Sequence, residues 1–198
     1  MRDDFGPSPS PDGKRLAFST ARWDTLSRYD IALLSLTDTV PHRLTSGPAS
    51  DGGVVWSSDG GRLAFGRSNW GTKPNEVCVV ALGDGALECH ETKDEQGIYP
   101  AGWLHDDRIV VMEGPSDYRS VSVLQWSTKQ SVRVFAGTLG NYSLSQDARW
   151  LYCTCATSAN GEPVPTVLPL AASNLLLASS LDARKETGRQ VTGGTRPE

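Results

Sequence analysis

Apolar and polar positions alternate in short runs along this chain, and the same arrangement of runs returns four times. Its clearest form opens with the turn Ser10-Pro11-Asp12-Gly13, which passes through a charged pair into the apolar segment Leu16-Ala17-Phe18. Proline fixes φ near −65°, Asp bonds its own backbone and glycine accepts a positive φ, so this turn is predicted to close a β-hairpin. Further copies lie at 56–65, 103–111 and, degraded, at 144–152.

The copies recur at a regular spacing. The first apolar residues after the turns lie 47, 46 and 42 residues apart, at Leu16, Leu63, Ile109 and Leu151. A period of about 40–50 residues with several short strands in each repeat is typical of a β-propeller. The pattern therefore predicts an all-β fold, a propeller of four-stranded antiparallel blades with about four blades present. The predicted blades span residues 1–47, 48–93, 94–137 and 138–194.

Each repeat divides into four strands, a to d, counted outward from the propeller axis. The first blade is predicted at 5–10, 15–20, 31–36 and 42–45, and the second has strand a ending at 56 and strands at 62–67, 77–82 and 86–90. The third is predicted at 99–104, 108–113, 121–126 and 131–135. The fourth has strands at 142–145 and 149–154, a long irregular insertion at 155–173, and strands at 175–177 and 187–193; a short helix over 175–185 is the alternative.

The repeats resemble the TolB-type, WD-like propeller repeat, whose hallmark is Trp-Ser-Pro-Asp-Gly-Lys-x-Ile-Ala-Phe and a closing Arg-Leu-Thr. Ser10–Phe18 keeps this block nearly intact, Trp56–Phe65 keeps it with Ser58 in place of proline, and Arg43-Leu44-Thr45 supplies the closing strand. The resemblance implies a propeller that commonly has six or more blades. It also implies either an exported protein, periplasmic or extracellular, or the gating propeller of a prolyl-oligopeptidase-like enzyme.

The number of repeats leaves the closure of the propeller open. Four repeats fit a fragment of a longer propeller, a small closed four-bladed disc, or an assembly of two chains. An open array would expose blade edges and an apolar blade face, through which self-association is expected. The N-terminus has no apolar stretch of the kind that a signal peptide carries.

Composition narrows the partners. The 198 residues carry a formal net charge of −4, and no cluster of Lys and Arg is present to neutralise phosphates, so nucleic acid is not an expected partner. The longest apolar run, 168–181, is interrupted by Pro169, Ser173 and Asn174, so no membrane insertion is expected.

The four cysteines show no metal-ligand spacing. If Gly83-Asp84 is a two-residue hairpin turn, Cys78 and Cys89 lie directly opposite each other on neighbouring strands. Two interpretations stay open for this pair: a cross-strand disulfide, or two small residues packed in a sheet. Cys153 and Cys155 share one face of a strand and are expected only to pack.

No catalytic or cofactor-binding constellation emerges. His42, His90 and His105 are scattered, and no metal or cofactor site is predicted. The recurring turn carboxylates, Asp12, Asp59, Asp106 and Asp147, are expected to be structural. Lys14-Arg15 and Gly61-Arg62 are expected to be solvated strand starts, and Trp56 and Trp103 to lie in the core.

The blade geometry selects one face for binding. The b–c loops and the d–a crossings between blades share one face of a propeller, which we call the loop face. Its loops concentrate residue types that are enriched at binding hot spots. The candidate partner-binding residues are Arg22, Trp23, Tyr29, Arg67, Trp70 and Tyr118. The alternative is that these side chains fold over the rim and pack on blade edges.

These observations favour a non-catalytic propeller scaffold that binds a protein or peptide partner through the loop face. One alternative is the substrate-gating propeller of a prolyl-oligopeptidase-like serine peptidase whose catalytic domain is absent from this chain. Another is a sensor propeller attached to a kinase or transcription regulator. The resemblance names no partner.

Overall fold

The computed structural model describes residues 3–24, 26, 28–70, 73–92, 97–105, 107–114, 119–156 and 161–170. Within these residues the chain forms antiparallel sheets of four, four and six strands. The first sheet contains β1 (Asp4–Pro9), β2 (Arg15–Thr20), β3 (Asp30–Ser35) and β4 (His42–Arg43). The second contains β5 (Ser50–Trp56), β6 (Arg62–Ser68), β7 (Glu76–Ala81) and β8 (Leu87–Glu91). The third contains β9 (Ile98–Trp103), β10 (Arg108–Glu113), β11 (Arg119–Gln125), β12 (Gln130–Leu144), β13 (Trp150–Ala156) and β14 (Val164–Pro169).

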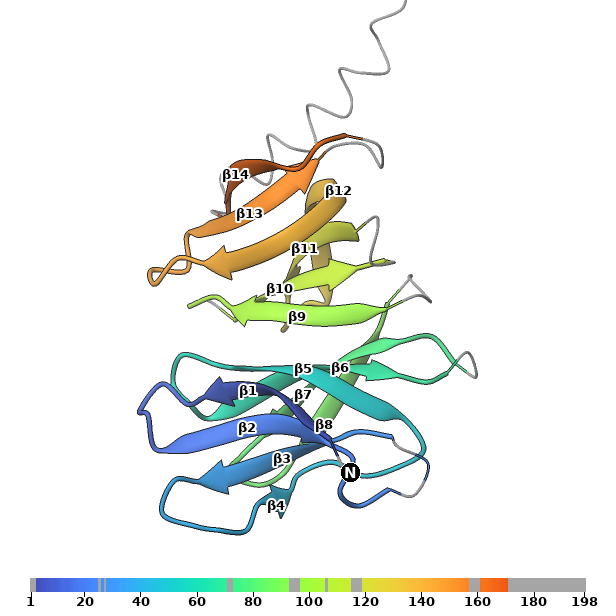
Figure 1. The fold of residues 1–198 in the computed structure, drawn as a ribbon, viewed down its shortest axis with the longest axis vertical. Helices are drawn as coiled ribbons and strands as arrows, with labels where there is room; N and C mark the ends of the chain where they lie inside the picture. The colour runs from blue at the N-terminus through green and yellow to red at the C-terminus, as the bar shows by residue number, and fades with distance from the viewer. Residues whose placement is uncertain are drawn as a thin grey trace, which may run out of the picture.

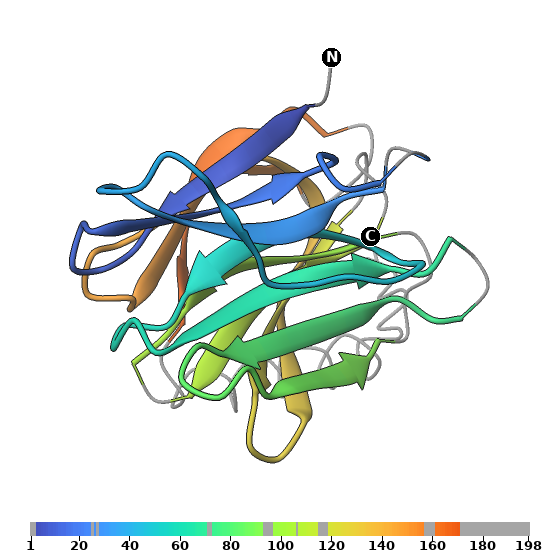
Figure 2. The same cartoon turned by 90° about the horizontal axis from the view of Figure 1, so that it is seen from below.

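The sheets stack in chain order along the long axis of the molecule, from β1–β4 to β13 and β14 (Figure 1). Seen along that axis, they lie one over another (Figure 2). Each is a meander in which sequential strands pair, as the repeat pattern predicts. We keep the word blade for the repeats: blade 1 is β1–β4, blade 2 is β5–β8, blade 3 is β9–β11 with the first half of β12, and blade 4 begins with the second half of β12.

The core lies between neighbouring blades. On β6, Leu63 and Phe65 are fully buried against blade 1, while Ala64 between them is buried in the cluster shared with blade 3. A strand covered on both faces needs apolar residues at consecutive positions, which explains the continuous apolar runs on the b and c strands. Full burial of a side chain such as Leu63 contributes about 1.5–3 kcal/mol to stability.

A shared hydrogen-bonded turn connects strands a and b in three of the blades. In blade 2 the Ser57 hydroxyl donates to the Asp59 carboxylate (2.6 Å) and accepts from the backbone N–H of Arg62 (2.9 Å). Ser10 with Asp12 and Ser145 with Asp147 repeat the bond in blades 1 and 4. These hydrogen bonds lower the pKa of all three carboxyl groups. The recurring carboxylates in these turns are therefore structural, as expected; Asp106 lies outside the described residues.

Two arginines expected to be solvated instead bridge neighbouring blades. The Arg15 guanidinium lies 4.9 Å from the ring centroid of Trp56, and that of Arg62 lies 4.6 Å from Trp103 in the next blade. Arg62 also pairs with Asp107 at 2.8 Å. Both tryptophans are buried, as predicted. A strand-b arginine is long enough to reach the adjacent blade, so it covers the tryptophan edge with its stem and guanidinium plane.

Blades 3 and 4 are joined differently from the prediction. The two strands expected at 131–135 and 142–145 form the single strand β12, which pairs first with β11 and then with β13. The partner changes after Gly137, whose φ is +156°. A Cβ atom there would lie 2.0 Å from the carbonyl oxygen of Ala156, so this close approach requires glycine.

The irregular insertion expected at 155–173 is also wrong in part. β14 lies inside it and pairs with β13 along its whole length, from Cys155 with Val164 to Trp150 with Pro169. Its two prolines suggested a loop. Among the described residues, however, β14 is an edge strand with one partner, and a proline facing an unpaired edge removes no ladder hydrogen bond. The strands predicted at 175–177 and 187–193, and the helical alternative, fall outside the described residues.

The cysteines are paired in the structure. Cys78 and Cys89 face each other across β7 and β8 and form a disulfide, with Cα atoms 4.0 Å apart. The connection spans Leu82 to Gly85 and is longer than the two-residue turn predicted, but it is still centred on Gly83 and Asp84 and therefore sets the same register. Cys153 and Cys155 lie in the core of blades 3 and 4, but they are also joined by a disulfide, where we expected packing alone.

Candidate binding cavity on the loop face

A cavity of about 330 Å³ opens on the loop face where blades 1, 2 and 3 meet. Its residues come from the starts of the a strands, the ends of the b strands and the b–c loops. Three of the candidate residues selected from the sequence border it: Tyr29, Arg67 and Trp70.

The blade 1 side of the cavity is an aromatic pair. The rings of Phe5 and Tyr29 meet edge to face with centroids 4.6 Å apart. Tyr29 is fixed to blade 2, because its backbone N–H donates to the Ser50 hydroxyl (3.1 Å) and its carbonyl accepts from the N–H of Asp51 (2.7 Å). The end of the blade 1 loop is thus anchored to the first strand of blade 2.

Glycine backbone forms part of the lining. Gly52, Gly66 and Gly97 border the cavity. A Cβ atom on Gly66 would lie 2.1 Å from the carbonyl oxygen of Ile98, so blades 2 and 3 approach this closely only with glycine at that position. On the blade 3 side, Tyr99 stands beside Gly97 with its side chain 44% exposed.

An ion pair lies in the wall of blade 2. Arg67 donates two hydrogen bonds to Asp51, from Nε to Oδ1 (2.8 Å) and from Nη2 to Oδ2 (2.9 Å). The two side chains are 15% and 3% exposed. The hydrogen bonds to Asp51 raise the pKa of Arg67, so the guanidinium stays charged. Because the two charges are matched within the wall, this part of the cavity presents no net charge.

Trp70 is the most exposed residue of the aromatic set, at 65%. Its φ is +53°, in the left-handed region that a bulky side chain seldom adopts. Such a backbone costs on the order of 1–3 kcal/mol and is found preferentially at functional sites. Trp70 therefore has an unfavourable backbone conformation and a large apolar side chain that is mostly exposed to solvent.

The other candidates lie elsewhere. Arg22 forms an ion pair with Asp4 on the first strand of its own blade. Trp23 lies beneath Arg43, whose guanidinium is 5.6 Å from the ring centroid, and Trp23 is 37% exposed. Neither residue borders the cavity. Tyr118 lies outside the described residues.

Among the cavity residues that sequence reasoning missed, three carry large or charged side chains from the a strands. Phe5, Asp51 and Tyr99 belong to a strands, whereas the prediction considered loops alone. A signal was present, since each is the second residue of its strand and therefore lies where the chain enters a blade from the loop face.

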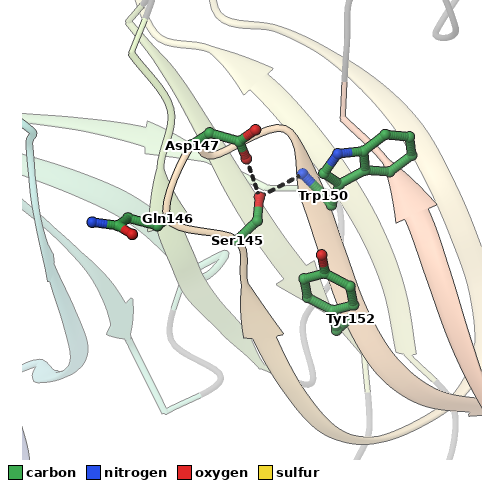
Figure 3. A pocket seen from close by; sticks show the side chains of 5 residues that line it. All are labelled: Ser145, Gln146, Asp147, Trp150 and Tyr152. Carbon is green, nitrogen blue, oxygen red and sulfur yellow. Dashed lines mark hydrogen bonds between the residues drawn. The ribbon is translucent and has the colours of Figure 1, made fainter.

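A second hollow, of about 460 Å³, lies on β13 and the preceding turn of blade 4 (Figure 3). The backbone N–H of Trp150 donates to the Ser145 hydroxyl (3.0 Å), which in turn donates to Asp147, so its polar groups belong to the recurring turn. Tyr152 occupies the position of Ala17, Ala64 and Val110, which are buried in blades 1 to 3. We therefore interpret this hollow as the uncovered face of blade 4.

The described residues contain one group suited by type and proximity to a metal ion: Glu76, Cys78 and Cys89, whose candidate ligand atoms lie within 4.8 Å of one another. The two sulfur atoms are joined in a disulfide, and Nη1 of Arg67 lies 3.7 Å from the Cys89 sulfur. A bonded sulfur pair beside a guanidinium does not suit a cation.

Solved structures establish the fold class. The chain is similar to TolB from Acinetobacter baumannii (TM-score 0.66, 15% identity, 83% of this chain and 40% of that one). It is also similar to a structure from a study of two prolyl endopeptidases (0.59, 21% identity, 84% and 26%). The β-propeller domain of the Trilobed protease from Pyrococcus furiosus is a third (0.55, 16% identity, 77% and 48%). The chain thus spans less than half the length of each.

The fold is that of a TolB-like β-propeller, of which the described strands form a part. No protein-family model matches the chain, and no curated protein matches it. In the part of the chain that the structure describes, no helix has the length and apolar character needed to cross a membrane.

Proposed function

We propose that this chain is a non-catalytic propeller scaffold that binds a protein or peptide partner through the loop face, with the cavity between blades 1, 2 and 3 as the centre of the contact. The observation that carries the proposal is Trp70, an exposed tryptophan on a left-handed backbone at the edge of an aromatic cavity. Tryptophan, tyrosine and arginine dominate the binding energy of protein interfaces, and all three border this cavity.

The surrounding structure supports a preformed site. Tyr29 is fixed by two hydrogen bonds to blade 2, and Arg67 is held at two points by Asp51. A partner that binds groups already held in place loses less conformational entropy on association. The blades supply rigidity, and the loop face supplies the variable side chains.

The test uses a random linear peptide library displayed on phage and selected on the wild-type chain. Selected peptides are measured by biolayer interferometry against wild type and the variants Trp70→Ala and Trp23→Ala. We expect Trp70→Ala to weaken binding by tenfold or more, whereas Trp23→Ala, a matched tryptophan loss from a b–c loop outside the cavity, leaves it unchanged. Equal binding by all three proteins would contradict the proposal.

A second candidate is the gating propeller of a serine peptidase. The similarity to the prolyl endopeptidase structure favours it, as does similarity to an acylaminoacyl peptidase from Pyrococcus horikoshii (TM-score 0.55, 15% identity). The gene that encodes this chain decides between the two. A peptidase requires a Gly-x-Ser-x-Gly segment with later Asp and His residues in the same reading frame.

The disulfides support export. Cross-links persist in oxidising compartments such as the periplasm or the extracellular space. We therefore propose that the chain works in such a compartment, and counting free thiols in protein isolated from its native source tests this. Four free thiols would contradict it.

A further inference from the structure

We infer that the cavity between blades 1, 2 and 3 takes one uncharged aromatic or large aliphatic side chain, presented by a peptide segment of the partner. This inference rests on the proposed function and goes beyond it, because it names the chemistry of the group that enters. It follows from three features of the cavity: its size, the exposed aromatic side chains around it and the pairing of its charges.

The size fits a single side chain. Ligand cavities range from about 300 to 1,000 Å³, and at about 330 Å³ this one stands at the lower end. A nucleotide or another extended cofactor needs more room. A single anchor residue is the way in which peptide partners commonly occupy a pocket of this kind.

Large aromatic side chains stand exposed around the cavity, beside the smaller polar side chains of Ser50, Ser68 and Asn75. Phe5, Tyr99 and Trp70 are 45%, 44% and 65% exposed, and they stand on blade 1, blade 3 and the blade 2 loop. Large apolar side chains that gather at one place on a surface mark interaction sites. An aromatic ring among them gains edge-to-face contacts of the kind that Phe5 and Tyr29 already make with each other.

The charges argue against an ionic ligand. Of the described residues that border the cavity, Asp51 and Arg67 are the charged ones, and two hydrogen bonds join them to each other. An anion would have to displace Asp51 from Arg67, and a cation would have to displace Arg67 from Asp51. Either exchange breaks a pair that is largely removed from water.

Aromatic surroundings also suit cations, so this alternative needs a separate argument. One guanidinium lies against a ring of this wall: that of Arg119, 5.8 Å from the ring centroid of Tyr99, whereas the charge of Arg67 is matched by Asp51. A lysine or methylated ammonium group that packs on Tyr99 would therefore approach the like charge of Arg119, whereas an uncharged side chain would not.

The peptides selected on the wild-type chain test the inference through their composition. Among those that lose binding to Trp70→Ala but not to Trp23→Ala, we expect one position enriched in Trp, Phe, Tyr, Leu or Met. Replacing that residue by alanine or by lysine in a synthetic peptide should weaken binding at least tenfold, as measured by isothermal titration calorimetry. Scrambled peptides of the same composition serve as controls.

The outcomes separate the two proposals. Trp70-dependent peptides with a conserved lysine, arginine, aspartate or glutamate anchor would overturn this inference and leave the peptide-binding function intact. Trp70-dependent peptides without any conserved anchor would also overturn it, since the cavity would then not be filled by one side chain. If no selected peptide depends on Trp70, both the function and the inference fail.

Discussion

The b–c loops of blades 1 and 2 carry the same residue types, yet the structure uses them differently. In blade 1, Arg22 is 43% exposed in its pair with Asp4, and Trp23 packs beneath Arg43. In blade 2, Arg67 is 15% exposed in its pair with Asp51, and Trp70 is 65% exposed.

The neighbouring blades account for the difference. In blade 2, Arg67 near the end of β6 and Trp70 in the loop that follows border a cavity shared with Tyr29 of blade 1 and Tyr99 of blade 3. An Arg and Trp combination in a propeller therefore indicates a binding site only where adjacent blades form a cavity beside it. Variants of the two blades test whether their ion pairs and tryptophans differ in this way.

The largest expected difference concerns the two ion pairs. Asp51→Asn leaves the guanidinium of Arg67 buried beside a neutral partner, and we expect a loss of about 3 kcal/mol in the free energy of unfolding. Asp4→Asn breaks an exposed pair and should cost less than about 1 kcal/mol. Urea denaturation of both variants measures the difference. Equal losses would show that the two pairs are equivalent.

Of the two ion pairs, the one in blade 2 contacts the Cys78–Cys89 disulfide, since Nη1 of Arg67 lies 3.7 Å from the Cys89 sulfur. Replacing Cys78 and Cys89 together by alanine removes a cross-link with a sequence separation of 11. From the lost constraint on the unfolded chain we expect a destabilisation of about 3 kcal/mol. Denaturation with and without dithiothreitol checks this: the reductant should lower the stability of the wild type by more than that of the double variant, which retains only the Cys153–Cys155 disulfide. Identical stabilities of the oxidised wild type and the variant would contradict it.

The two tryptophans should differ in thermal stability. Trp23→Ala loses the packing beneath Arg43 and should cost about 1 kcal/mol, which is a fall of about 2–4 °C in Tm for a chain of this size. Trp70→Ala removes a side chain with few packing contacts and should shift Tm by less than about 1 °C. Differential scanning calorimetry provides the measurement. A larger fall for Trp70→Ala than for Trp23→Ala would identify Trp70 as a packing residue and remove the basis of the proposed site.

Backbone strain gives a smaller effect of opposite sign. Trp70→Gly accepts a φ of +53° without a Cβ penalty and should stabilise the chain by up to about 1 kcal/mol. Ala148→Gly is the matched control, because Ala148 has a φ of +54° in the recurring turn, where Gly13 and Gly60 stand in blades 1 and 2. A gain for Ala148→Gly without one for Trp70→Gly would mean that the Trp70 ring compensates its backbone through contacts.

Acid should weaken the exposed ion pair between Arg22 and Asp4. The hydrogen bond from Arg22 lowers the pKa of Asp4, so the folded chain holds this proton less tightly than the unfolded chain. The stabilisation is present above about pH 4, the ordinary Asp value, and is lost as the pH falls through the lower, folded pKa. Asp4→Asn should flatten part of the acid limb of a Tm profile, with the turn carboxylates supplying the rest. An unchanged slope would show that Asp4 is not linked to folding.

Much of the fold is legible in the sequence because each blade repeats a local device. The turn Ser57-Ser58-Asp59-Gly60 fixes a hairpin by its own hydrogen bonds, and the continuous apolar run that follows it forms the buried strand β6. The register of Cys78 with Cys89 followed from a turn centred on Gly83 and Asp84. Local chemistry of this kind does not depend on the rest of the chain.

What could not be predicted depends on contacts between blades. Three features depend on the distance between two sheets, which no local pattern encodes. They are the contact of Arg15 with Trp56, the continuous strand β12 across two blades, and the close approach of Gly66 to Ile98. The cavity is of the same kind. Tyr29, Arg67 and Trp70 were selected from loop composition, but Phe5 and Tyr99 join them only once three blades are stacked.

Hydrogen–deuterium exchange of the wild-type chain, with and without a selected peptide, locates the bound partner on the molecule. If the partner binds over the cavity between blades 1, 2 and 3, exchange should slow at the backbone amides of Phe5, Tyr29, Asp51, Trp70 and Tyr99, with no change at Arg22 and Trp23 or along β13. Protection confined to β13, or to Arg22 and Trp23, would place the contact elsewhere and rule out binding over the cavity.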